Sequence, residues 1–158
     1  MEPLSKSDVS AVYPPRYELN QETFSIAQGL IRDLWNERRL EHGLPPTDDR
    51  SSSCKFASLI ARELFGGRLA GNEMHVFVLR DGAVLDLNEE QTDVLLLAEQ
   101  AHHEIPKCIQ HRDYRASLGT CMPRVRHWIK VAEERMPATA RLDRALVVGL
   151  DECEALII

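Results

Sequence analysis

Three residues in the middle of the chain carry the side chains that thiol-based acyl transfer requires. Cys54 is a thiol nucleophile, His75 is a base that can accept its proton, and Asp86 is an acid that can orient the histidine. They occur in this order within SSSCKFASLIARELFGGRLAGNEMHVFVLRDGAVLDLN, which begins at Ser51. A thiol reacts as the thiolate, and a neighbouring base promotes that form. We therefore predict that these three residues form a catalytic site.

The sequence around Cys54 predicts that this residue lies in the first turn of a helix. The serines Ser51–Ser53 are typical helix-capping residues, and Gly66-Gly67 is a typical helix end. Between them, apolar side chains recur at helical spacing: Phe56, Leu59, Ile60 and Leu64. The first turn of a helix has unpaired N–H groups and favours negative charge. Cys54 is thus placed where a thiolate, and the oxyanion that forms when it attacks a carbonyl, would both be stabilised.

The other two residues are predicted on the paired strands of a hairpin. Residues 74–79 and 83–87 read as strands, and Asp81-Gly82 between them is a strong two-residue turn signal. This turn pairs Leu79 with Val84, and further along it pairs Phe77 with Asp86. Because side chains alternate along a strand, Asp86 then shares a face with His75.

The rest of the chain is predicted to form one α+β domain over residues 20–158, preceded by an irregular N-terminal arm over residues 1–19. A helix capped by Asn20 should end at Gly43, because apolar residues recur at helical spacing between them. Further elements are a link at 68–73, a short helix from Asn88 to Leu97 or Ala98, an irregular connection at 99–114, a helix at 118–136 and late strands within 145–158.

Composition narrows the class of protein. The chain of 158 residues has a net charge of −6 and no concentrated basic segment, which disfavours nucleic acid as a partner. No apolar stretch is long enough to span a membrane, and the N-terminus does not resemble a signal peptide. We therefore expect a cytoplasmic protein whose four cysteines are reduced thiols.

A second group of residues could in principle bind zinc. It comprises two histidines followed by further histidine and cysteine residues: His102, His103, Cys108, His111 and Cys121. Their spacing matches no established zinc pattern, and solvated loop histidines are the simpler interpretation. We expect no metal and no cofactor, although a zinc-stabilised module would be an alternative to the enzyme.

The order of nucleophilic Cys on a helix, His on the next strand and Asp on the strand after it resembles the minimal core of papain-like and transglutaminase-like cysteine enzymes. The segments SSSCKFASLIARELFGG, GNEMHVFVLRDGAVLDLN and YRASLGTCMPRVRHW are more narrowly similar to the YunG family of small bacterial proteins. This resemblance covers roughly residues 50–130. It implies a papain-like α+β fold with Cys54, His75 and Asp86 as active-site residues, and it implies no substrate. Papain-type proteases place a Gln before the nucleophile to stabilise the oxyanion, and residues 47–53 contain none.

The predicted function is cysteine-dependent acyl transfer on a peptide, protein or other amide or thioester, by hydrolysis or by transfer to an amine. Asn72 and Asn88 flank the two strands and are candidates for binding the substrate amide, although capping a turn is the simpler role for each. The alternative is a non-catalytic protein-binding or regulatory module that retains the fold. The oligomeric state is not predicted.

Overall fold

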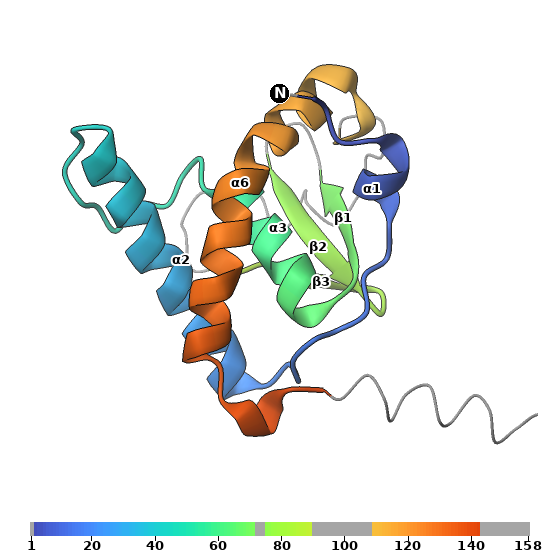
Figure 1. Ribbon diagram of the computed structural model, residues 1–158. Helices are drawn as coiled ribbons and strands as arrows, with labels where there is room; N and C mark the ends of the chain where they lie inside the picture. Colours follow the sequence, from blue (N-terminus) through green and yellow to red (C-terminus); the bar gives the residue numbers. More distant parts are fainter. Residues whose placement is uncertain (1, 72–74, 90–108, 143–158) are drawn as a thin grey trace, which may run out of the picture.

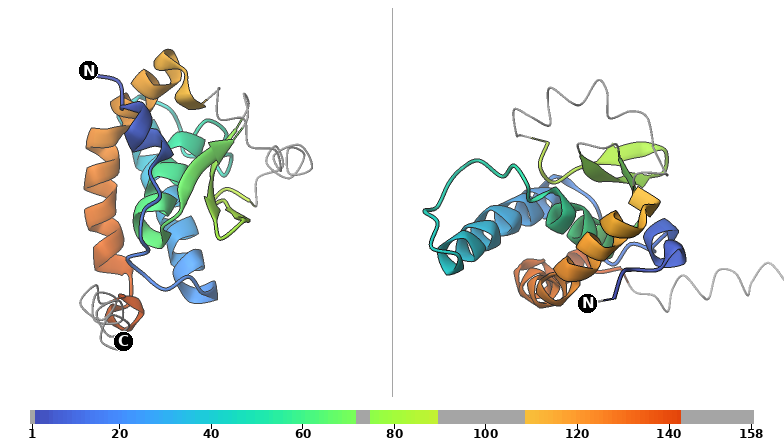
Figure 2. Two further views of the ribbon diagram at one scale, coloured as in Figure 1. Left: turned by 90° about the vertical axis from the view of Figure 1, so that its right-hand side faces the viewer. Right: turned by 90° about the horizontal axis from the view of Figure 1, so that it is seen from above.

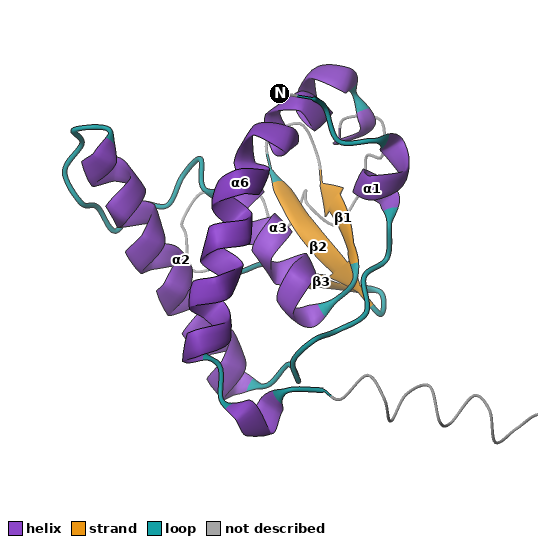
Figure 3. Cartoon of the chain, in the orientation of Figure 1, coloured by secondary structure: helices purple, strands orange, loops and turns teal. Residues whose placement is uncertain are grey.

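The computed structural model of the protein describes residues 2–71, 75–89 and 109–142, and within them the fold is α+β (Figures 1 and 3). Its α-helices are α1 (Lys6–Ser10), α2 (Gln21–Glu41), α3 (Cys54–Phe65) and α6 (Arg112–Arg135), followed by a short 3-10 helix at Ala138–Ala140. Its strands are β1 (Arg68–Gly71), β2 (Val76–Arg80) and β3 (Ala83–Leu85), in the antiparallel order β1-β2-β3.

Helix α3 lies at the centre of the fold. Figure 2 shows the sheet on one side of it and the long helices α2 and α6 on the other. Nine of its twelve residues are buried, among them Leu59, Ile60 and Leu64. The ring of Phe56, on the same helix, packs between Trp35 of α2 and Trp128 of α6. Burial of this apolar surface fixes the direction of α3 and so the position of its first residue, Cys54.

Helix α2 begins and ends where the sequence predicts. Asn20 accepts a hydrogen bond from the Thr23 N–H at 3.0 Å, and the Thr23 hydroxyl accepts one from the Asn20 N–H at 3.0 Å. This reciprocal cap satisfies two N–H groups that the helix leaves open. After the helix, Gly43 adopts a φ of 71°, which is costly for any residue with a Cβ.

The predicted hairpin is confirmed in its turn and in its register. Asp81 and Gly82 have φ values of 51° and 77°, as expected for a two-residue turn with a positive φ at both positions. Leu79 pairs with Val84, and β3 ends at Leu85 opposite Val78. The hairpin therefore ends one residue before Asp86, so the predicted pairing of Phe77 with Asp86 is not made, and His75 and Asp86 lie just beyond the strands rather than on them.

Three predicted segments differ from the structure. The N-terminal arm contains α1, because Ser5 and Asp8 form a reciprocal cap that starts a helix of five residues. The predicted link after α3 contains β1, which pairs with β2 along its whole length. Helix α6 begins at Arg112 rather than 118, since His111 accepts from the Asp113 N–H, and it contains Pro123 in its interior.

Other predictions fall outside the described residues. They are most of the helix from Asn88 to Leu97 or Ala98, most of the irregular connection at 99–114, and the late strands in 145–158. Within the described part of the chain, no helix combines the length and the apolar character needed to cross a membrane.

Candidate active site

Cys54 is the first residue of α3 and is half-buried. The preceding residue, Ser53, occupies the N-cap position but does not cap the helix with its side chain. Its hydroxyl instead donates to the backbone carbonyl of Arg50 at 2.7 Å. The prediction that one of the serines begins this helix is confirmed, although the usual capping hydrogen bond is not made.

The N–H groups in the first turn of α3 are therefore left open. The helical hydrogen bonds begin with the Ala57 N–H, which donates to the Ser53 carbonyl at 2.9 Å. The preceding N–H groups, from Cys54 to Phe56, have no acceptor within the helix. The other three described α-helices each have a side-chain acceptor at this position. Donors in this first turn, beside the thiol, are in the place where an oxyanion would form.

His75 and Asp86 are joined by a hydrogen bond between Nε2 and Oδ2. His75 directly precedes β2 and Asp86 directly follows β3, and both side chains are buried, with exposed fractions of 5% and 7%. Burial disfavours a charged imidazole, but hydrogen bonds to Asp86 and to Cys54 outweigh it and raise the pKa of His75 from 6.5 to about 10. Because Asp86 engages Nε2, Nδ1 is the ring nitrogen that remains for an interaction with the thiol.

Gly71, on β1, lies very close to the backbone of His75. Gly71 pairs with Val76 and has a φ of 151°. A Cβ at this position would lie 2.2 Å from the carbonyl oxygen of His75, so only glycine permits this approach. This role of Gly71 was not predicted, because the segment at 68–73 has no local signal and reads as a link.

Asn88 connects the hairpin to the start of α3. Its side-chain amide donates to the Ser53 hydroxyl at 2.8 Å, and its backbone N–H donates to Asp86 Oδ1 at 2.9 Å. These bonds connect His75 and Asp86, through Asn88, to Ser53, the residue before Cys54. Ser53 and Asn88 are separated by 35 positions, so no local spacing could have revealed their contact.

Of the two asparagines predicted to contact substrate, only Asn88 falls within the described residues. Its exposed fraction is 2%, and its amide group is directed to Ser53 rather than to the surface. Asn88 therefore has a structural role, because it connects Asp86 to Ser53. Asn72 lies outside the described residues.

The possible zinc ligands are only partly described. Among the described residues, no group of three or more His, Cys, Asp or Glu side chains could hold a metal ion, and His102, His103 and Cys108 lie outside them.

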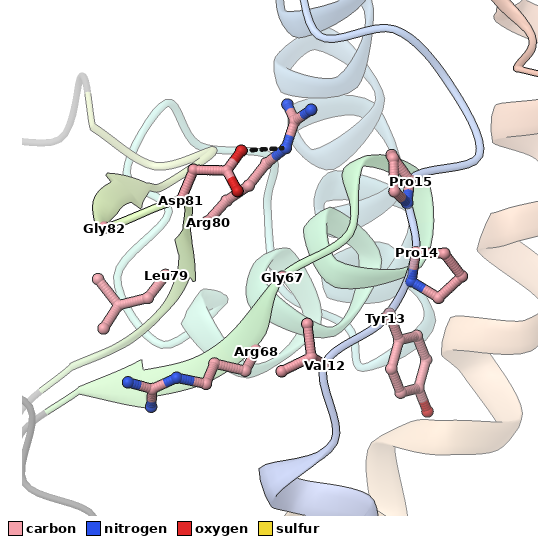
Figure 4. Close-up of a pocket in the computed structure, with 10 residues that line it drawn as sticks. All are labelled: Val12, Tyr13, Pro14, Pro15, Gly67, Arg68, Leu79, Arg80, Asp81 and Gly82. Atoms are coloured by element: carbon pink, nitrogen blue, oxygen red, sulfur yellow. Dashed lines mark ion pairs between the residues drawn. The ribbon is translucent and has the colours of Figure 1, made fainter. Parts of the chain in front are cut away.

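A groove of about 630 Å³ lies between residues 12–15 and the β2–β3 turn (Figure 4). It lies at the turn end of β2, whereas His75 precedes the other end of that strand. An ion pair between Arg80 and Asp81 borders this groove, and none of its lining residues is a nucleophile or a histidine.

Comparison of the chain with protein-family models, with curated protein sequences and with solved structures found no match. The resemblance to the YunG family stays a prediction, and the functional argument rests on the site itself.

Proposed function

We propose that the protein catalyses acyl transfer through a covalent thioester on Cys54, with His75 as the proton carrier and Asp86 as its orienting partner. The observation that carries this proposal is the buried hydrogen bond between His75 Nε2 and Asp86, and interactions with Asp86 and Cys54 together raise the pKa of His75. An imidazolium beside a thiol at a helix N-terminus is the setting in which cysteine nucleophiles react as thiolates.

In the proposed reaction, the Cys54 thiolate attacks the carbonyl carbon of an amide or thioester. The carbonyl oxygen becomes an oxyanion, which accepts hydrogen bonds from the open N–H groups in the first turn of α3. The His75 imidazolium then gives its proton to the leaving amine or thiol as the bond to it breaks. A thioester between the acyl group and Cys54 results.

The second half of the reaction regenerates the enzyme. Neutral His75 accepts a proton from water or from an amine, which attacks the thioester and releases the acyl group from Cys54. Water gives hydrolysis and an amine gives transamidation. Asp86 accepts the hydrogen bond from Nε2 throughout, so Nδ1 faces the thiol in both halves of the reaction.

The absence of a Gln before the nucleophile does not remove the oxyanion site in this proposal. Ser53 leaves the first turn of α3 without a side-chain cap, so the N–H groups there supply more than one donor. The same contacts support a papain-like arrangement of the helix that carries Cys54 and the hairpin. The reduced thiols of Cys54 and Cys121 fit the cytoplasmic location expected from the sequence.

The test is the rate at which iodoacetamide alkylates Cys54 as a function of pH, measured by peptide mass spectrometry. We compare the wild type with His75→Gln and with a control, His127→Gln, which removes an exposed histidine on α6. Cys121 serves as an internal reference, because burial raises the pKa of its thiol. Labelling of Cys54 should persist below neutral pH and slow by about tenfold or more in His75→Gln, but not in the control.

The opposite result would identify a structural cysteine. In that case labelling would rise only near the pKa of a free thiol, about 8.5, and would ignore His75. The protein would then fit the non-catalytic binding module. If the first result is obtained, acylation of Cys54 by p-nitrophenyl acetate, followed by intact mass, tests the covalent step directly.

A further inference from the structure

A cationic pocket of about 420 Å³ opens beside the start of α3. It lies between the end of α2, the first turn of α3 and the middle of α6. Its lining includes Arg38, His42, Lys55 and Arg124 and no carboxylate. This concentration of positive charge stands out in a chain whose net charge is −6.

One of these cations is already neutralised. Arg124 Nη1 lies 3.0 Å from Glu41 Oε1, and a second hydrogen bond joins Arg124 Nη2 to Oε2 of the same carboxylate. The other two permanent cations have no such partner. Within the described part of the chain, neither Arg38 nor Lys55 forms an ion pair with a carboxylate. The pocket therefore has an uncompensated positive charge.

Aromatic rings hold these two side chains in place instead. The Arg38 guanidinium lies 5.3 Å from the ring centroid of Trp35 and 5.3 Å from that of Phe56. The Lys55 ammonium lies 4.9 Å from the ring centroid of Tyr114. A guanidinium stacked on a ring keeps its N–H edge available for a planar anion, and its stacking lowers the entropy cost of binding one.

The wall of the pocket also contains a donor without an acceptor. Trp35 lines the pocket and has an exposed fraction of 6%, and its Nε1–H has no hydrogen-bond partner among the described residues. A buried donor in this state is uncommon and needs an explanation. The Nε1 atom is itself closed off from solvent, so this donor belongs to the buried side of the Trp35 ring and marks no ligand contact.

The pocket borders the nucleophile. Ser52 and Lys55, which lie on either side of Cys54 in the chain, both line it. Cys121 lies in the same lining, and its thiol interacts electrostatically with Lys55, Arg38 and Cys54. A ligand group in the pocket would therefore lie at the start of α3, between the two residues that flank Cys54 and on the side of the helix that faces α2 and α6.

We infer that this pocket binds an anionic oxygen group, a carboxylate or a phosphate, on the molecule whose acyl group Cys54 attacks. The inference rests on the proposed function and specifies its substrate class as amides or thioesters that carry such a group near the reacting carbonyl. Two cations held on aromatic faces suit either anion, because the same N–H and ammonium donors bind both. A volume of about 420 Å³ is that of a small-molecule site.

The first experiment compares iodoacetate with iodoacetamide as alkylating agents for Cys54. The two reagents differ in charge, so the ratio of their rates reports the potential at the thiol. The variants are Arg38→Gln and Lys55→Met, and the control is Lys130→Met, which removes an exposed charge elsewhere on α6. His75 is present in all four proteins and attracts iodoacetate equally in each. The informative quantity is therefore the change in the ratio of the two alkylation rates between the wild type and a variant.

The ratio should fall by about threefold or more in each pocket variant and stay unchanged in Lys130→Met. An equal ratio in all four proteins would overturn the inference. Lys55→Met is included because Arg38 packs on two core rings, and its replacement also affects stability.

The second experiment measures anion binding without any reaction at Cys54. Succinate or inorganic phosphate is titrated into Cys54→Ala at constant ionic strength, and tryptophan fluorescence reports binding near Trp35. We expect a saturable change that is lost in Cys54→Ala/Lys55→Met, and the anion that binds more tightly identifies the class. No saturable change with either anion would overturn the inference. Saturable binding together with His75-independent labelling would keep the anion pocket and reject the proposed enzyme.

Discussion

The side-chain amide of Asn88 lies 2.8 Å from the hydroxyl oxygen of Ser53, and this hydrogen bond joins the segment after the hairpin to the residue before Cys54. Both side chains are buried, with exposed fractions of 2% and 0%. Because the Ser53 hydroxyl is engaged in this bond, it does not cap the first turn of α3. It therefore has two effects, because it aligns Asp86 with Cys54 and leaves the N–H groups beside Cys54 open.

Removal of this bond should lower both stability and reactivity. Asn88→Ala should reduce the free energy of unfolding by about 1–3 kcal/mol, because it leaves a buried hydroxyl with one acceptor site unused and a cavity beside it. Alkylation of Cys54 by iodoacetamide should slow in the same variant. Urea unfolding and peptide mass spectrometry measure the two effects.

A double-mutant cycle tests whether the two residues act as a pair. Ser53→Ala and Asn88→Ala should be non-additive, with a coupling of about 0.5–1.5 kcal/mol in the unfolding free energy. Effects that sum to within about 0.3 kcal/mol would show that the contact carries no energy of its own.

The stability contributed by His75 should depend on pH with a defined sign. The pKa of His75 is raised in the folded protein, from 6.5 to about 10, so folding favours its protonated form. The stabilisation is complete below pH 6.5 and is lost as pH rises toward 10. The difference in unfolding free energy between wild type and His75→Gln should therefore shrink over this window, by at most about 1.4 kcal/mol per pH unit. A difference that is constant or grows with pH would contradict the charged pair.

Two glycine substitutions separate steric contact from backbone strain. Gly71→Ala would place a Cβ 2.2 Å from the His75 carbonyl oxygen, whereas Gly82→Ala would meet no atom within 4 Å. Both positions have a positive φ, so both variants carry strain of about 1–2 kcal/mol. Gly71→Ala should lose clearly more stability in urea unfolding, and it alone should slow alkylation of Cys54. Equal losses in the two variants would mean that β1 does not position His75.

Arg62 should hold the N-terminal helix on the fold. Its guanidinium is buried, its Nη1 donates to the Asp8 carbonyl at 2.7 Å, and it lies 4.1 Å from the ring centroid of Tyr13. Burial lowers the pKa of Arg62, an effect that the nearby Tyr13, Glu63 and Asp8 partly offset. Arg62→Met keeps an apolar side chain of similar length but removes the donors.

Amide exchange around α1 should accelerate in Arg62→Met, and stability should fall by about 1–3 kcal/mol. The matched control is Arg126→Met, at an exposed position of α6, where exchange in α1 should not change. If amide exchange in α1 were equal in the two variants, contacts other than those of Arg62 would hold α1 on the fold.

The parts of the fold that could be predicted are those with local signals. Asn20 and Gly43 bound α2, and Asp81-Gly82 sets the register that brings Asp86 beside His75, because caps and tight turns depend on a few neighbouring residues. Strand β1 could not be predicted in the same way. Its four residues pair with β2 only because α3 directs the chain there, and no periodicity is visible over so short a segment.

The start of α6 shows a different limit. Pro123 is typical of a first turn, yet here it lies within the helix, which continues on both sides because its other residues pack on α3. In the site, the three reactive residue types were visible in sequence, whereas the link from Asn88 to Ser53 and the pocket at Arg38 depend on segments that meet only in the folded protein.

The order of the site along the chain has a consequence for biosynthesis. Cys54 leaves the ribosome before His75, and the hydrogen bonds of the site form only once Asp86 and Asn88 have followed and the hairpin has docked on α3. Until then, the cysteine has neither its base nor its fixed helix turn. On the proposed function, the nascent chain therefore carries an ordinary thiol, and reactivity at Cys54 would appear only after α6 has also been made and packed on α3.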